Sequence, residues 1–236
     1  MNWLYGKRHA PPKEDALPPP QSGFAQYFYV LKTHFWKFVK LSLLLVAFSI
    51  PVITLPAALC GVNRVCIRLI RDGNCFLWDD FWGEFRSSFL KSVSFGFLFG
   101  AGFAASYYLL SLGISNGQSI YGVLFLSLGI CSLLISALLG SWTFVLTAML
   151  PLKSADILKN ARALAGLEGK RNLVILSILA ASTAFTLLLF PISLAPALFF
   201  LPSAAQFSLC FIVNSAVQER IIAPFEASNR AKSELP

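Results

Sequence analysis

The sequence predicts an all-α polytopic membrane protein with five to six membrane helices arranged in hairpins and two amphipathic interfacial helices on the cytoplasmic side. Two long stretches, Ser92–Leu152 and Asn172–Gln218, contain no Asp, Glu, Lys, Arg or His. About 20 apolar residues cross the hydrocarbon core as a helix, so each stretch fits two crossings and a turn. Only 13% of the 236 residues are charged, against roughly a quarter in soluble domains. The stretches also lack the strict alternation of a membrane barrel.

The chain divides into one membrane domain and two short tails. Residues 1–22 combine five prolines with charged residues and have no apolar core, which predicts a disordered, Pro-rich cytoplasmic tail rather than a signal peptide. Residues 23–223 are expected to form a single membrane domain. Residues 224–236 are expected to be a short C-terminal tail.

The first membrane segment allows two topologies. Gly23–Lys40 mixes aromatic and basic residues, a combination that favours the headgroup zone. The uncharged segment Leu41–Asn63 follows, and two prolines interrupt it. If it crosses once, the protein has five spans and an exterior N-terminus. If the chain turns at Pro51–Leu55, a helix beginning at Pro56 returns and the protein has six segments, because proline suits the first turn of a helix.

The two longer stretches divide at turn signals. Gly113–Ser119 is rich in Gly, Ser and Asn, and Pro191–Leu201 separates an outgoing helix from a returning one that begins at Pro202. The segment Ile120–Leu150 would be roughly 46 Å long as a helix. This length exceeds a hydrocarbon core of about 30 Å, so the helix is expected to tilt, kink or protrude.

The basic residues favour the six-segment topology. With three hairpins, every outward turn lacks Lys and Arg, and all 19 basic residues lie on the cytoplasmic side, as the positive-inside rule requires. Both termini are then cytoplasmic. The net charge of +8 is interpreted as contact with the anionic lipids of the inner leaflet, and no nucleic-acid partner is expected.

Two segments have the pattern of amphipathic helices. Phe76–Leu90 places Trp78 and Trp82 on one face with other aromatic residues, and Lys153–Gly166 separates apolar residues from basic ones. Both are expected to lie on the inner leaflet. The alternative is that they form a docking surface for a cytoplasmic partner.

Asn63, Arg64 and Arg68 form the most suggestive polar group of the sequence. An ionisable residue at membrane depth is a functional hypothesis by default. This group could contact an anionic lipid headgroup or an acidic side chain of a partner. The alternative is that the arginines lie at the inner end of a helix and extend their guanidinium groups to lipid phosphates.

Small residues predict close helix packing in the first half of the middle stretch. Gly96 and Gly100 are spaced four residues apart, which allows two membrane helices to approach closely. Packing within the domain is the expected use, and self-association is the alternative.

The sequence offers no catalytic or metal-binding pattern. Its five cysteines form no CxxC pair, and only two histidines are present, so we expect no metal site, no cofactor and no enzymatic activity. No acidic residue falls within a predicted span. This argues against a proton-coupled carrier, which commonly uses one.

The stretch Ile50–Ser92 resembles the YesL-like family of bacterial membrane proteins, which is domain of unknown function 624. The matching elements are the aromatic–basic lead FWKFVKLSLLL, the proline turn IPVIT and the aromatic segment around Trp78 and Trp82. A second element, LPLKSADILKNARALAGLEGKRN, is similar to a later part of the family. Leu55 stands where the family commonly has glycine, which makes the turn stiffer.

The resemblance implies a multi-pass protein of the bacterial plasma membrane, similar to proteins encoded beside carbohydrate-uptake transporters. It carries over no activity and no catalytic residue. The first functional hypothesis is therefore an accessory or regulatory component of carbohydrate uptake, with a sugar ABC transporter permease as its partner. The alternative is a small solute transporter or channel that acts on its own.

Overall fold

The computed structural model describes residues 23–117, 119–190 and 194–222, and these residues are folded almost entirely into helices. The two predicted tails, residues 1–22 and 224–236, lie outside the described residues. All six predicted membrane segments are helical: α2 (Phe35–Ser49), α3 (Leu55–Asp72), α5 (Phe89–Ser115), α6 (Ile120–Met149), α8 (Gly169–Leu188) and α10 (Leu201–Val217).

Four of the described helical segments are long and apolar enough to cross a membrane: Val52–Asp72, Phe89–Ser115, Ile120–Met149 and Gly169–Leu188. The helices α2 and α10 are shorter, with 15 and 17 residues. The short helix α1 (Gly23–Thr33) precedes α2, and the π-helical turn η2 (Gln218–Ile222) follows α10. The predicted fold class, an all-α polytopic protein, is confirmed.

The first hairpin turns at the prolines, as the six-segment topology predicts. The 3-10 helix η1 (Val52–Thr54) forms the turn. The Thr54 hydroxyl shares its one proton between the carbonyl oxygens of Phe48, at 2.5 Å, and Pro51, at 2.7 Å. Pro56 lies in the first turn of α3, where its missing N–H costs nothing.

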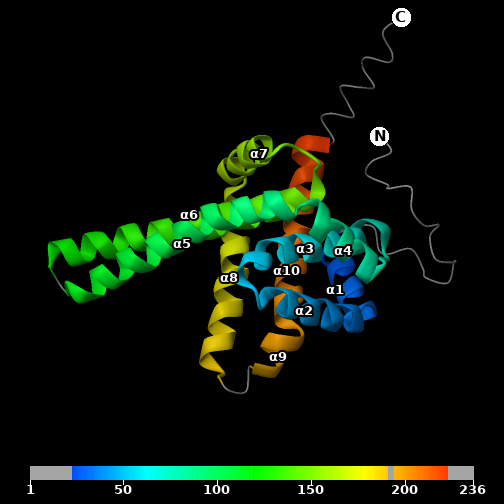
Figure 1. The fold of residues 1–236 in the computed structure, drawn as a ribbon, viewed down its shortest axis with the longest axis horizontal. Helices are drawn as coiled ribbons and strands as arrows, with labels where there is room; N and C mark the ends of the chain where they lie inside the picture. Colours follow the sequence, from blue (N-terminus) through cyan, green and yellow to red (C-terminus); the bar gives the residue numbers. More distant parts are fainter. Residues whose placement is uncertain (1–22, 118, 191–193, 223–236) are drawn as a thin grey trace, which may run out of the picture.

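Helix α3 lies at the centre of the molecule and contacts α1, α2, α4, α5, α6 and α10 (Figure 1). In the most apolar 18-residue stretch of this segment, 61% is buried inside the protein. The corresponding buried share is 17% in α5 and in α6 and 6% in α8. The other long helices therefore present most of their apolar surface outward.

The last turn of α3 leads into Gly73, which has a φ of 69°, a left-handed conformation that glycine adopts without strain.

The α5–α6 hairpin extends away from the rest of the molecule (Figure 1). Small residues let the two helices approach closely: a Cβ atom on Gly102 would lie 2.5 Å from the Ser136 hydroxyl oxygen, and one on Gly129 would lie 2.9 Å from Leu110 Cγ. Ser106 and Ser132 share a hydrogen bond of 2.9 Å between the helices. Close packing of small residues is typical of membrane helices.

Helices α8 and α10, with the short α9 (Leu194–Phe199) between them, run across the direction of the α5–α6 hairpin (Figure 1). The Trp142 indole N–H of α6 donates a hydrogen bond of 3.0 Å to the Asn172 side-chain oxygen of α8 near this crossing. Two crosswise hairpins cannot both stand upright in one flat bilayer. At least one of them is therefore tilted, as the length of α6 predicts.

The two amphipathic helices are α4 (Leu77–Ser87) and α7 (Ser154–Leu167). Most of their apolar faces cover other helices rather than lipid. Phe81 and Phe85 of α4 are buried beside α3, and Ile157 and Ala161 of α7 are buried beside α6. Neighbouring helices thus bury apolar faces that the sequence analysis expected to lie against the inner leaflet.

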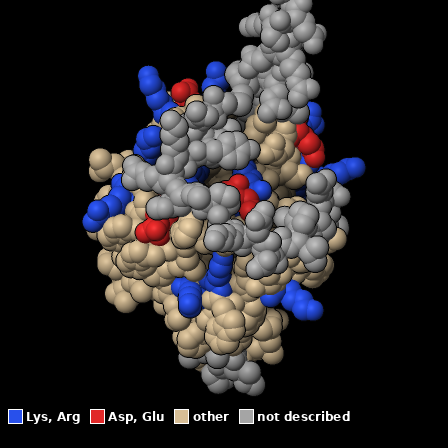
Figure 2. Space-filling model, turned by 90° about the vertical axis from the view of Figure 1, so that its right-hand side faces the viewer, with Lys and Arg blue, Asp and Glu red and all other residues tan. Residues whose placement is uncertain are grey.

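Charged side chains are unevenly distributed over the face that carries α1 and α4. Figure 2 views the side on which α1 and α4 lie, and Lys, Arg, Asp and Glu are spread over its upper and middle parts. The lower end, toward α9, shows no charged side chain in this view. This asymmetry agrees with the charge-free sequence from Asn172 to Gln218.

The glycine pair of α5 gives a matched test of helix packing. A Cβ atom on Gly96 would lie 2.3 Å from Pro56 Cγ, whereas one on Gly100 would meet nothing within 4 Å. We expect Gly96→Ala to destabilise the protein by about 1–3 kcal/mol, because the proline ring cannot rotate away. Gly100→Ala should leave stability unchanged or raise it slightly.

Thermal unfolding of the two purified variants in a mild detergent measures this difference. Equal unfolding midpoints for Gly96→Ala and Gly100→Ala would contradict the close contact between α5 and the start of α3.

Candidate functional site

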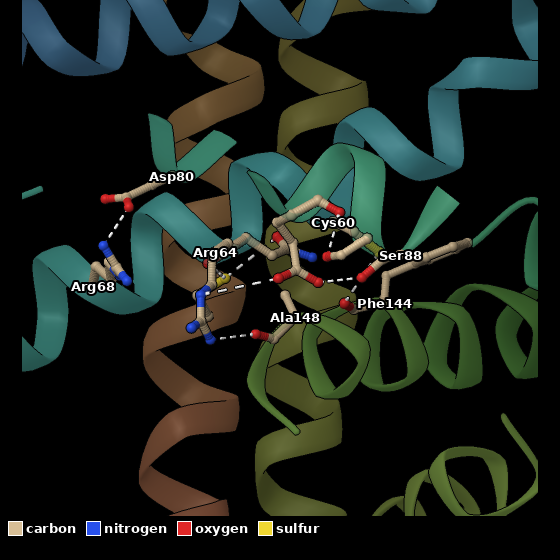
Figure 3. Close-up of polar contacts among 11 residues, drawn as sticks. Cys60, Arg64, Arg68, Asp80, Ser88, Phe144 and Ala148 are labelled. Carbon is tan, nitrogen blue, oxygen red and sulfur yellow. Dashed lines mark hydrogen bonds and ion pairs between the residues drawn. The ribbon is translucent and has the colours of Figure 1, made fainter. Parts of the chain in front are cut away.

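Arg64 lies against the C-terminal end of α6. Its Nη1 atom donates a hydrogen bond of 3.0 Å to the carbonyl oxygen of Ala148, in the last turn of that helix (Figure 3). Nearby, Lys91 Nζ donates a hydrogen bond of 3.0 Å to the carbonyl oxygen of Leu152. The last carbonyls of a helix lack partners within it and carry partial negative charge. The two cations therefore cap α6 and the segment that follows it.

Arg64 also faces the carboxylate of Glu84 on α4, with 4.0 Å between Arg64 Nε and Glu84 Oε2. The Ser88 hydroxyl donates a hydrogen bond to the other oxygen, Oε1. Burial raises the pKa of Glu84, and it outweighs the Ser88 hydrogen bond and the charges of Arg64 and Lys91, which lower it. The ion pair is loose because its distance exceeds a hydrogen bond.

Arg68 forms a second ion pair with α4, to Asp80 Oδ1 (Figure 3). The side chain of Asp80 is 7% exposed, and its Oδ2 atom accepts a hydrogen bond of 3.1 Å from the backbone N–H of Phe76. Burial raises the pKa of Asp80, whereas Arg68 lowers it. The two arginines are four residues apart on α3 and the two acids are four residues apart on α4, so the ion pairs lie one helical turn apart.

Asn63 faces a different neighbour. It is fully buried, and its side-chain oxygen accepts a hydrogen bond of 3.3 Å from the Cys210 thiol of α10. Its Nδ2 atom has no hydrogen-bond partner among the residues that the structure describes. The structure therefore separates Asn63, which joins α3 to α10, from Arg64 and Arg68, which join α3 to α6 and α4.

Trp78 and Trp82 form part of an aromatic stack on α4. Their ring centroids lie 5.9 Å apart, and Trp82 stacks on Phe85 at 5.3 Å. The Arg86 guanidinium lies 4.8 Å from the Trp82 ring centroid, within the range of a cation–π interaction. Trp78 is 55% exposed and is the ring available for lipid or a partner, while Trp82 is half-buried.

A half-open cavity of about 320 Å³ lies between α3, α4, the start of α5 and the end of α6. Its charged lining is Arg64, Glu84 and Lys91. Residues 87, 88 and 147–151 complete the lining, with hydroxyl groups at positions 87, 88 and 147. Sequence reasoning singled out Arg64 but missed Glu84, Ser88 and Lys91. The equal spacing of Arg64 and Arg68 on one helix and of Asp80 and Glu84 on the next is the pattern that could have revealed the pairing.

The comparison with family models identifies part of the chain. Residues 38–109 match DUF624, described as a protein of unknown function. The predicted resemblance is thereby confirmed for this segment, which contains both arginines, both acids and Lys91 of the site. The later element LPLKSADILKNARALAGLEGKRN lies outside the matched residues. No curated protein and no solved structure matches the chain.

The raised pKa of Glu84 predicts a pH dependence of stability. The folded protein holds this proton more tightly than the unfolded chain, so unfolding releases it at a pH above the ordinary pKa of Glu, about 4.3. The Glu84 contribution to stability therefore falls as the pH rises from that value through the raised folded pKa. We expect Glu84→Gln to remove this part of the pH dependence, measured as unfolding midpoints across that range.

Glu219 is the matched control. The hydrogen bond from Arg171 lowers the pKa of Glu219, so its contribution is present above the ordinary pKa and is lost as the pH falls through the folded one. Glu219→Gln should change the pH profile in the opposite direction. Identical profiles for the wild type and Glu84→Gln would contradict the raised pKa.

Proposed function

We propose that this protein is an accessory or regulatory membrane component associated with carbohydrate uptake, which packs sideways against a sugar ABC transporter permease. The carbohydrate link and the partner class come from the family resemblance. The observation that supports a lateral partner is the α5–α6 hairpin, which extends beyond the other helices and keeps its outer faces apolar (Figure 1).

The outer face of α5 has the chemistry of a helix-packing surface. Phe103, Tyr107 and Ile114 recur at helical spacing and are 42%, 77% and 74% exposed. The hairpin needs no further helix for its own cohesion, because Gly102, Gly113 and Gly129 bring α5 and α6 into direct contact. Its outer faces are thus available to lipid or to the helices of another membrane protein.

The two amphipathic helices contribute less to a partner surface than the sequence suggested. The buried face of α4 lies on α3, and that of α7 lies on α6. Only the outer edges of α4, with Trp78, and of α7 remain exposed. A cytoplasmic partner would meet these edges, and a permease would meet the hairpin.

A pulldown in mild detergent from the native host, grown on complex glycans, tests the proposal. The wild-type chain should co-purify with permease subunits. The variant Phe103→Ala/Tyr107→Ala/Ile114→Ala should lose them by roughly fivefold or more, because large side chains at a packed interface carry most of its binding energy. Leu173→Ala/Leu187→Ala on α8, where both residues are also exposed, is the matched control.

Unchanged capture by the hairpin variant would contradict lateral packing through α5. Solute flux in liposomes that contain the purified chain alone would overturn the accessory role and establish the alternative, a transporter or channel.

We further propose that the protein resides in the bacterial plasma membrane with both termini in the cytoplasm. The turn between α5 and α6 then lies outside. A reporter that is active only outside the cytoplasm should be active when inserted at Asn116 and silent when fused at Asn2. The reverse pattern would contradict this orientation.

A further inference from the structure

We propose that the cavity lined by Arg64, Ser88 and Lys91 binds a phosphate group, carried by a phospholipid headgroup or by a soluble phosphate. This site is independent of the proposed role in carbohydrate uptake. It uses donors that the fold leaves available on the two cations that cap α6.

The donor groups of the cavity exceed its internal acceptors. A guanidinium has five N–H donors and an ammonium has three. Among the described residues, Arg64 donates one hydrogen bond, to Ala148, and lies 4.0 Å from Glu84, while Lys91 donates one, to Leu152. Phosphate oxygens are strong acceptors for both groups. The remaining donors can therefore bind a phosphate without breaking the caps.

The charge balance of the lining favours an anion. Two cations, Arg64 and Lys91, face one carboxylate, Glu84, in the lining of the cavity. The hydroxyls of Ser87 and Ser88 already donate to the Glu84 carbonyl and carboxylate oxygens, so the available donors are those of the two cations. The Glu84 carboxylate already accepts the Ser88 hydroxyl and is too far from Arg64 Nε for a hydrogen bond. The positive charge of the cavity is thus only partly neutralised.

The dimensions and the location suit a phosphate at the membrane surface. A volume of about 320 Å³ lies at the lower end of the range of small-molecule sites. The cavity lies where α5 begins at Phe89 and α6 ends at Met149, the level at which a membrane hairpin leaves the hydrocarbon core. Leu90, beside Lys91, is 80% exposed, so an acyl chain could lie next to the opening.

The test uses the full-length protein purified in mild detergent, and it measures the shift of the unfolding midpoint in titrations with three probes. The probes are phosphatidylglycerol, phosphatidylcholine and inorganic phosphate. Saturable stabilisation by phosphatidylglycerol alone assigns the site to an anionic lipid. Stabilisation by both phospholipids but not by inorganic phosphate assigns it to phospholipids in general. Stabilisation by inorganic phosphate assigns it to a soluble ligand. Each of these outcomes supports the proposal, and no saturable shift with any probe would overturn it.

Charge variants give opposite expected signs. Lys91→Gln should weaken the apparent affinity by about fivefold, the effect of one cation near a membrane surface. Glu84→Gln should strengthen it, because it removes the only carboxylate that lines the cavity among the described residues. Lys159→Gln on α7, away from the cavity, should leave it unchanged.

Lys91→Gln also loses a cap on Leu152, so its folding is checked by circular dichroism and size-exclusion chromatography. If Lys91→Gln fails to fold, Glu84→Gln still tests the proposal. Equal affinity of Glu84→Gln, Lys159→Gln and the wild type for the saturating probe would overturn the assignment of the ligand to this cavity.

Discussion

The guanidinium groups of α3 impose the constraint that organises the centre of this protein. A cationic side chain in a membrane domain is costly unless it reaches a partner, and α3 is both the most buried of the long apolar helices and the carrier of Arg64, Arg68 and Arg71. Together the arginines reach three elements. Arg64 caps α6, Arg68 pairs with Asp80 of α4, and Arg71 Nε donates a hydrogen bond of 3.0 Å to Asn214 of α10. These arginines are partly buried, so removing their partners would cost stability, and the same interactions hold three elements around α3.

These contacts also explain the orientation of α4. Ion pairs one turn apart fix the rotation of α4 about its own axis relative to α3. That rotation turns Phe81 and Phe85 inward, where Phe48 packs against them with ring centroids 5.5 Å and 5.3 Å away. Trp78 is left at the outer edge. The ion pairs and the burial of Phe81 and Phe85 therefore favour the same orientation of α4. The short helix is part of the core rather than a separate membrane anchor.

Local sequence signals predicted the helices and their turns well. Charge-free runs located the membrane helices, with five or six segments allowed, and Pro56 and the Gly- and Ser-rich turn before Ile120 marked where helices begin. The crosswise arrangement could not be predicted, because it depends on contacts such as Trp142 with Asn172, which apolar periodicity does not encode. For the candidate site, membrane depth singled out Arg64 and Arg68. Lys91 was missed because its acceptor, Leu152, lies 61 residues away in the chain. Asn63 was grouped with the arginines by proximity in sequence, although a helix directs adjacent residues to different sides.

The crossing of α6 and α8 makes the protein responsive to the thickness of its bilayer. A helix as long as α6, roughly 45 Å, fits a thin membrane only when it leans, and it rises toward the normal as the membrane thickens. Helix α8, roughly 30 Å long, has no such excess length. The Trp142–Asn172 hydrogen bond joins the two helices near their crossing, and α3, α7 and α10 also pack against α6. We therefore expect a change in lipid chain length to alter the tilt of the free end of the hairpin, while its packed end stays held by these neighbours.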